Sequence, residues 1–296
     1  MKRAWLFALV LALCATPSGF CQNVKASPPA AAPVAGDDPR EIIRRAAEND
    51  FANELKTHEY TYVERDETRR LNSKGGTKST ESKTYDVLFL AGEQTQRLTA
   101  KNDKPLPAKE AAKEDERLEK IIRKREQESP EKKQKRLAEE EKERAESRKF
   151  VLEIAEAYNF TMEQPETLNG RETYVIAAEP RPGFQPHMKY ANYLPKFRFH
   201  IWIDKAELQW VKLHVDVLDT VSWGLFLLRL HKGSQIELEQ TRVNDEVWLP
   251  EHVHARLDAR VGLLMQFNIE VDQTYRDYRE FQSGVRILSS APAPKP

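Results

Sequence analysis

Cysteine is nearly absent from this chain. Among 296 residues only Cys14 and Cys21 carry a thiol, and both lie in an N-terminal segment that has the composition of a secretory signal. A basic start, Met-Lys-Arg, precedes an apolar run over residues 4–15 that is too short to cross a membrane as a stable helix. Cleavage before Gln22 leaves a mature chain without thiols, so disulfides are excluded as a source of its stability.

We therefore expect a signal peptide over residues 1–21 and a periplasmic or secreted protein. A lipid anchor on Cys21 is the weaker alternative, because Phe20 occupies a position where lipoprotein processing normally requires a small side chain. Residues 22–38 are rich in Pro, Ala and Ser and predict a disordered linker, and residues 289–296 predict a tail of the same kind. The remaining residues are expected to form one domain.

An excess of charge of one sign is also missing. The chain has 47 basic and 47 acidic residues, and removal of Lys2 and Arg3 with the signal leaves the mature protein slightly acidic. This balance argues against a nucleic-acid partner. The sequence contains no Gly-x-Ser-x-Gly, no His-Glu-x-x-His and no glycine loop of the phosphate-binding kind. We therefore predict no enzyme activity and no cofactor.

Helical spacing is the first positive signal after the linker. Asp38 and Pro39 are typical of a helix start, and apolar residues follow at helical intervals: Ile42, Ile43, Ala46, Ala47, Phe51 and Leu55. Strands are predicted next, beginning at Tyr60 and again over residues 84–90, with a third around Leu98. Turns are predicted at residues 74–76, 91–92 and 102–105.

Residues 109–148 consist almost entirely of Glu, Lys, Arg, Ala and Gln, with a break at Ser129-Pro130. This pattern predicts a charged helical hairpin, inserted between the strands and continuing to about residue 157. Its apolar positions are few, which favours a solvated hairpin with a narrow docking seam that includes Leu118, Ile121 and Leu137. A role in binding a protein partner of the cell envelope remains the alternative for this segment.

Period-two alternation returns at Tyr158 and dominates the second half of the chain. Asn169-Gly170 predicts a tight hairpin turn, and prolines predict an irregular loop over residues 181–195. The loop's aromatic residues, Phe184, Tyr190 and Tyr193, either form a lid over a pocket or seal the sheet edge. The repeated strands predict an α+β fold: a curved antiparallel β-sheet, or half-barrel, packed on the N-terminal helix across residues 39–288.

Strand parity assigns faces to these strands. Phe197, Phe199, Val211, Leu213 and Val215 fall on the apolar face, whereas Trp202, Trp210 and the histidines fall opposite. His252 and His254 share one face of a strand, and His200 and His214 would join them if the strands were adjacent. Metal binding is nevertheless disfavoured, because nothing nearby in the sequence completes a ligand set, and we predict no metal.

Four segments of the meander resemble the outer-membrane lipoprotein-sorting superfamily, that is, the LolA/LolB-like periplasmic carriers and the related sensor domains of periplasmic regulators. The segments are Leu-Gln-Trp-Val-Lys at 208–212, Leu-Arg-Leu-His-Lys-Gly at 228–233, Asn-Asp-Glu-Val-Trp-Leu-Pro at 244–250 and Tyr-Arg-Asp-Tyr-Arg-Glu-Phe at 275–281. The resemblance covers residues 40–107 and 158–282 at the level of the fold.

The resemblance implies a half-barrel with helices across its concave side and an apolar cavity that accepts acyl chains. It therefore predicts an exported, non-enzymatic carrier or sensor whose ligand is a lipid or the acyl chain of a lipoprotein. A structural or protein-interaction module that uses the charged hairpin is the alternative. From strand parity, the candidate ligand-binding residues are Phe197, Phe199, Val211, Leu213, Val215, Leu225, Leu227, Leu263, Met265 and Phe267.

Overall fold

The computed structural model describes residues 38–90, 93–223, 228–262 and 265–280. The predicted signal peptide and C-terminal tail lie outside these ranges, as do the turn predicted at residues 91–92 and all but the last residue of the predicted linker. None of the helices within the described ranges is long and apolar enough to cross a membrane.

Helix α2 (Pro39–Thr57) begins where the sequence predicted. The Asp38 side chain caps it by accepting the backbone N–H of Arg40 at 3.0 Å. Ile42, Ile43 and Ala46 are buried against the sheet. Leu55, predicted on the same apolar face, is 62% exposed. The reason is geometric, because twelve residues of α-helix after Ile43 turn a side chain about 120° away from the starting direction.

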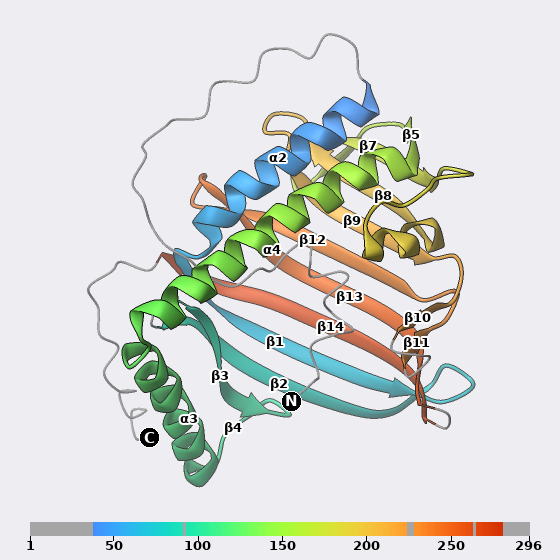
Figure 1. The fold of residues 1–296 in the computed structure, drawn as a ribbon. Helices are drawn as coiled ribbons and strands as arrows, with labels where there is room; N and C mark the ends of the chain where they lie inside the picture. The colour runs from blue at the N-terminus through green and yellow to red at the C-terminus, as the bar shows by residue number, and fades with distance from the viewer. Residues whose placement is uncertain (1–37, 91–92, 224–227, 263–264, 281–296) are drawn as a thin grey trace.

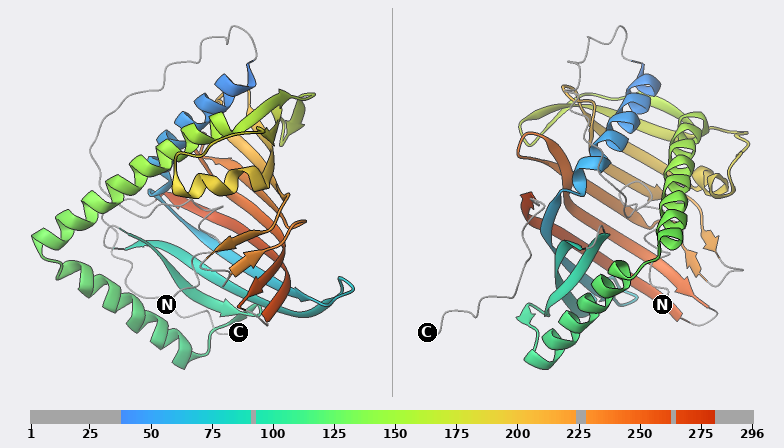
Figure 2. Two further views of the ribbon diagram at one scale, coloured as in Figure 1. Left: turned by 45° about the vertical axis from the view of Figure 1, so that its right-hand side comes forward. Right: turned by 60° about the vertical axis from the view of Figure 1, so that its left-hand side comes forward.

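The strands form one 14-stranded antiparallel sheet with the order β4-β3-β2-β1-β14-β13-β12-β9-β8-β7-β5, and β6, β10 and β11 lie off this path. The predicted half-barrel is confirmed: the sheet curves without closing into a barrel (Figures 1 and 2). The first seven strands are β1 (Tyr60–Leu71), β2 (Thr77–Leu90), β3 (Glu93–Lys101), β4 (Lys104–Pro105), β5 (Tyr158–Met162), β6 (Glu166–Leu168) and β7 (Arg171–Pro180). The other seven are β8 (Phe197–Asp204), β9 (Trp210–Val217), β10 (Val221–Trp223), β11 (Leu228–Leu230), β12 (Gln235–Val243), β13 (Val247–Val261) and β14 (Met265–Glu280).

The first and last strands of the chain's described part pair with each other inside this sheet. Strand β1 pairs with β14 in a register that runs from Tyr60 opposite Glu280 to Arg70 opposite Ile269. Every other pair along the main path joins strands that are closer in sequence. The β1–β14 pair therefore unites an N-terminal meander with the longer C-terminal one.

The charged segment forms α3 (Ala108–Glu126) and α4 (Pro130–Ala157), separated at the predicted break. The two helices diverge as a V in the left view of Figure 2. Helix α3 packs against β3 through Leu118, which is buried, and through ion pairs that include Arg97–Asp115 at 2.8 Å. Helix α4 crosses the concave face of the sheet beside α2 (Figure 1). The sequence predicted a mainly solvated hairpin, whereas this helix also packs against another part of the fold.

The proline-rich loop is more regular than predicted. Residues 181–195 were expected to lack regular structure, but η1 (Lys189–Lys196) is a 3-10 helix that includes most of the second half of this stretch. A hydrogen bond joins this helix to β5, because the Tyr158 hydroxyl donates to the Leu194 carbonyl at 2.5 Å. Phe184 is buried in the same cluster as Tyr158, so this aromatic ring seals the sheet edge, as one of the two sequence readings proposed.

Candidate functional site

A cavity of about 180 Å³ lies between α2, α4 and the concave face of the sheet. A space of only ~10–15 Å³ admits one water molecule, so this cavity is large enough to hold part of an organic ligand. Its wall is assembled from three directions: α2 on one side, α4 on another, and strands β8, β9, β12 and β13 beneath, with Tyr62 and Gln94 from the N-terminal strands.

Helix α2 leaves room for the cavity because two of the residues that face it are small. Ala46 and Ala47 lie on the cavity wall between Ile43 and Phe51. A methyl group at these positions keeps the helix apolar without filling the space beneath it. The Phe51 ring in turn packs under the Arg148 guanidinium of α4, whose central carbon lies 5.7 Å from the ring centroid.

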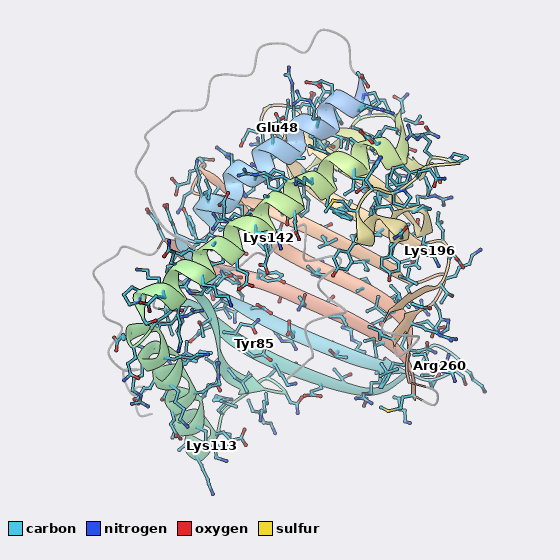
Figure 3. All side chains as sticks on the ribbon, in the orientation of Figure 1. Glu48, Tyr85, Lys113, Lys142, Lys196 and Arg260 are labelled. Carbon is cyan, nitrogen blue, oxygen red and sulfur yellow. The ribbon has the colours of Figure 1, made fainter. Side chains whose placement is uncertain are left out.

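Helix α4 contributes Ser147, Val151 and Ile154 to the wall. Their spacing of four and three residues puts them on one face of the helix, together with Arg144 one turn earlier, and most of the Lys, Arg and Glu side chains that dominate its sequence lie on the other faces. Figure 3 labels Lys142 on α4 and Tyr85 on the sheet. The apolar part of this face, Val151 and Ile154, thus follows the charged residues 109–148, in the last turns of α4.

The sheet side of the cavity depends on a β-bulge in β9. Ile201 pairs with Leu213, but Ile203 pairs with Trp210, so Val211 is an extra residue without a partner on β8. The bulge moves Trp210 to the apolar face, where it lines the cavity with Leu213. The sequence prediction that Trp210 lies on the opposite face is wrong. It assumed strict alternation of side chains along β9, and the extra residue of the bulge interrupts this alternation.

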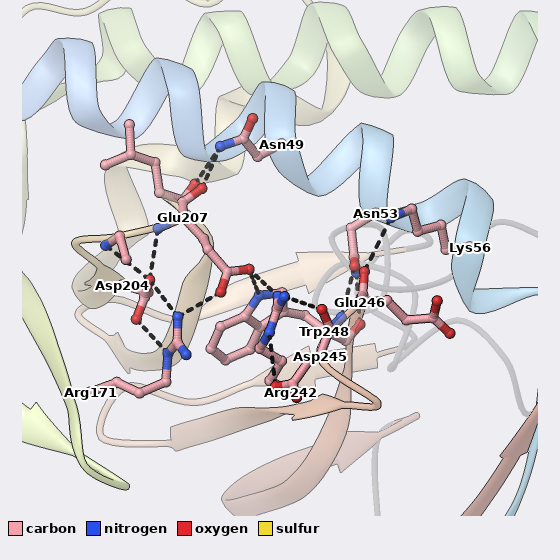
Figure 4. Close-up of polar contacts among 12 residues, drawn as sticks. Asn49, Asn53, Lys56, Arg171, Asp204, Glu207, Arg242, Asp245, Glu246 and Trp248 are labelled. Atoms are coloured by element: carbon pink, nitrogen blue, oxygen red, sulfur yellow. Dashed lines mark hydrogen bonds and ion pairs between the residues drawn. The ribbon is translucent and has the colours of Figure 1, made fainter. Parts of the chain in front are cut away.

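Asparagine side chains of α2 hold the helix at its distance from the sheet. Asn53 accepts the Trp248 backbone N–H at 2.8 Å and donates to the Trp248 carbonyl at 2.7 Å. One turn earlier, Asn49 donates to the carbonyls of Glu207 and Leu208. Figure 4 shows these contacts between the helix above and the strands below. These hydrogen bonds fix the distance between α2 and the sheet, and so the space that the cavity occupies.

An ionic network continues from these contacts (Figure 4). Arg171 binds the buried Asp204 carboxylate through two nitrogens, at 2.7 and 3.0 Å, and also binds Glu207. Glu207 additionally accepts the Trp248 indole N–H at 2.9 Å and pairs with Arg242. The network ties β7, the β8–β9 turn and the β12–β13 hairpin together next to the cavity.

Asp50 is the titratable group on the cavity wall whose environment is most unusual. Its Oδ1 accepts the Trp210 indole N–H and the Gln209 amide N–H, each at 2.8 Å. Burial raises the pKa of Asp50 from 3.8 to about 7, and the Glu54 charge adds to the rise, against the lowering effect of the two hydrogen bonds. The cavity therefore has a carboxyl group that changes its charge near neutral pH.

This pKa makes a stability prediction for Asp50→Asn. The folded protein favours the protonated form of Asp50. The stability that this preference contributes is therefore complete below about pH 4, and it is lost as the pH rises through about 7 and the carboxyl ionises. The asparagine keeps an acceptor but does not ionise. We expect the free energy of unfolding of the variant to exceed that of the wild type increasingly between pH 4 and 8, by roughly 2–4 kcal/mol at the upper end. Urea denaturation at several pH values measures the difference.

Glu48→Gln is the matched control, because Glu48 is an exposed carboxyl on the same helix, with a side chain that is 60% exposed. Its curve should run parallel to that of the wild type over this range. Parallel curves for Asp50→Asn as well would contradict the assigned environment of Asp50.

Two further carboxyl groups lie on β1, on the side of the strand that faces the same way as Tyr62 of the cavity wall. Glu64 and Asp66 follow Tyr62 on β1, and both are held by amides: Gln96 donates to both Glu64 oxygens at 3.0 and 2.9 Å, and Gln273 donates to Asp66 at 2.7 Å. Burial, and for Glu64 also the neighbouring Asp66, raises the pKa of both carboxyls. The pair therefore retains a proton at pH values at which exposed carboxyls have lost theirs.

The residues proposed from strand parity that the structure describes do not all line the cavity. Phe199 and Leu213 line the cavity. Phe197 and Val215 lie in the largest core cluster, and Val211 is buried at the bulge. On β14, Met265 is 57% exposed and Phe267 lies under the Arg70 guanidinium. Leu225, Leu227 and Leu263 lie outside the described residues.

The four histidines lie on the convex face as two separate pairs, because β12 stands between β9 and β13 and the adjacency that would join all four is absent. His200 lies opposite His214, but Glu237 of β12 stands between His214 and His254. His252 and His254 both contact Asp272, at 3.1 and 3.5 Å. Within the described ranges no group of three or more His, Cys, Asp or Glu side chains is arranged to hold a metal ion.

Sequence reasoning missed most of the cavity wall that the helices provide. Ala47, Phe51, Val151 and Ile154 belong to apolar stripes that the sequence displays, but a stripe does not reveal whether it meets a filled core or a space. Gln240 on β12 was missed as well, because a single polar residue on an apolar strand face is the only sign of it.

Comparisons with known proteins give similarity at the level of the fold, as the sequence resemblance did. No family model matches the chain, and no curated protein matches it. Among solved structures, a putative outer membrane lipoprotein-sorting protein domain from Vibrio parahaemolyticus matches with 13% identity and a TM-score of 0.35, over 83% of this chain and 94% of that one. A LolA superfamily protein from Nitrosomonas europaea matches with 9% identity and a TM-score of 0.32, over 82% of this chain and 93% of that one. A chain of the Pseudomonas aeruginosa MucA/MucB complex matches with 9% identity and a TM-score of 0.23, over 83% of this chain and 100% of that one.

Proposed function

We propose that this protein is an exported, non-enzymatic carrier or sensor that binds an apolar chain, such as the acyl chain of a lipid or lipoprotein, in the cavity beneath α2 and α4. The observation that carries the proposal is the cavity itself: about 180 Å³ of space whose wall is formed largely by Ala, Ile, Val, Phe, Leu and Trp side chains. A wall of this composition binds by removing apolar ligand surface from water.

The energy available from such burial is sufficient without any charged contact. Each 100 Å² of apolar surface removed from water contributes about 2.5 kcal/mol. A chain of several methylene groups therefore offsets the cost of immobilising the ligand and still binds measurably. The proposed location is the periplasm, in keeping with the predicted signal peptide.

Native mass spectrometry of the protein purified from the periplasm of an expression host tests this proposal. Organic extraction then identifies any bound species. We expect a co-purifying molecule with an alkyl chain, or adducts after incubation with lipids of graded chain length. A mass equal to that of the bare chain both before and after incubation with phospholipids, fatty alcohols and acylated peptides would overturn the proposal.

A protein-interaction role is the second candidate, and one observation favours it. No residue in the first half of α4, from Pro130 to Glu143, is fully buried, although this half is as regular as the second half, which lines the cavity. A partner of the cell envelope would find an exposed charged surface there. Replacing Lys132, Lys135 and Lys142 by Glu should then abolish capture of the partner while leaving alkyl-chain binding unchanged.

A further inference from the structure

The amide of Gln240 is the polar group on the cavity wall that most needs explanation. Gln240 lies on the concave face of β12, two residues beyond the buried Leu238, and is only 6% exposed. No group in the described ranges donates a hydrogen bond to its Oε1. An unpaired buried carbonyl is unfavourable, since it has lost water without gaining a partner. Its position on the wall leaves the cavity as the place from which a donor can reach it.

Asp50 adds acceptor capacity to the wall of the same cavity. Both of its donors, Gln209 and Trp210, reach Oδ1. Trp210 is in β9, the strand that pairs with β12, so the tie between Asp50 and Trp210 brings this carboxyl towards the strand that carries Gln240. The two side chains give the apolar wall a local patch that accepts hydrogen bonds.

The charges around the patch select against acidic ligands. Above about pH 7, where Asp50 is ionised, two carboxylates, Asp50 and Glu54, line the cavity against one guanidinium, Arg144, and Arg144 also lies 3.6 Å from Glu141. A phosphate or carboxylate placed next to Gln240 would meet like charge in a poorly solvated space. The Gln240 amide itself offers an acceptor without a countercharge, which suits an uncharged donor.

We propose that the ligand of this cavity is an amphiphile whose uncharged head donates a hydrogen bond, from a hydroxyl or an amide N–H, to Oε1 of Gln240. This inference rests on the proposed function, and it adds the chemistry of the head to that of the chain. The apolar wall holds the alkyl part, and Gln240 distinguishes ligands that have a donor from those that lack one.

The test compares 1-decanol with its methyl ether, which share an alkyl chain and differ in the O–H donor. Trp210 and Trp248 line the cavity, so intrinsic fluorescence reports binding. We expect the wild type to bind decanol about threefold to tenfold more tightly than the ether, as one additional hydrogen bond implies. In Gln240→Met, which keeps an unbranched side chain but removes the amide, decanol should lose this advantage while the ether binds as before.

Gln235→Met is the matched control, because Gln235 begins the same strand but is exposed; it should keep the preference. The wild-type comparison alone decides the matter if Gln240→Met fails to fold. Equal wild-type affinity for the two probes would overturn this inference and leave the proposed function standing. Binding of neither probe, nor of decylamine or decanoate, would count against the proposed function itself.

Discussion

Replacing Ala47 by Trp should reduce the affinity of the protein for an alkyl ligand by about a hundredfold while the fold is retained. Ala47 lies on the cavity wall, and an indole ring there occupies space that the ligand would otherwise fill. Excluding ~110 Å² of ligand surface at ~25 cal/mol per Å² corresponds to about 2.8 kcal/mol, or two orders of magnitude in the dissociation constant. Titration with 1-decanol, followed by calorimetry, measures the change.

Ala52→Trp provides the control on the same helix. Ala52 is exposed and does not line the cavity, so the identical substitution there should leave the affinity within about twofold of the wild type. Circular dichroism and the thermal midpoint establish whether both variants are folded. Unchanged decanol affinity in a folded Ala47→Trp variant would show that the ligand binds elsewhere.

The largest loss of stability is expected from Asp204→Ala. The Asp204 carboxylate is 1% exposed; it accepts two hydrogen bonds from Arg171 and two from the backbone N–H groups of Ala206 and Glu207. Its removal leaves the guanidinium without its buried partner and the β8–β9 turn without its internal acceptor. We expect the free energy of unfolding to fall by about 3–5 kcal/mol, measured as a lower urea midpoint with an unchanged slope.

Glu172→Ala is the control, because it removes a neighbouring carboxylate that is exposed rather than buried. Glu172 pairs with Lys205 at 3.5 Å, and its side chain is 76% exposed. Because exposed ion pairs contribute little, this variant should lose less than about 0.5 kcal/mol. Similar losses in the two variants would mean that the Asp204 network contributes no more than a surface pair.

The sequence predicted the strands better than it predicted their faces. Alternation located β8, β9, β12, β13 and β14, because a strand with one buried face repeats every two residues. The Asn169-Gly170 turn was predictable because both residues adopt positive φ there, at 50° and 78°. The bulge at Val211 was not, since nothing in the local pattern distinguishes an extra residue from a regular one. That single residue changed the face assigned to Trp210.

The cavity could be predicted only in outline. A resemblance in fold pointed to a hollow beneath the helices, and parity supplied Phe199 and Leu213. The height of α2 above the sheet, however, depends on Asn49 and Asn53 bonding to backbone groups about 160 and 195 residues away. Hydrogen bonds between a side chain and a distant backbone group produce no periodic pattern in the sequence. The position of α2 relative to the sheet was therefore not predictable from it.

The pairing of β1 with β14 has a consequence for the order of events in folding. Strand β1 is made early and β14 almost last, since the register joins Tyr60 to Glu280. A chain that emerges from its N-terminus can form the β1–β2–β3 meander, but one edge of that meander must wait for a partner until nearly all the other residues have appeared. Long-range pairing of this kind is slow. The N-terminal meander is therefore the region in greatest need of protection from wrong strand partners during biogenesis.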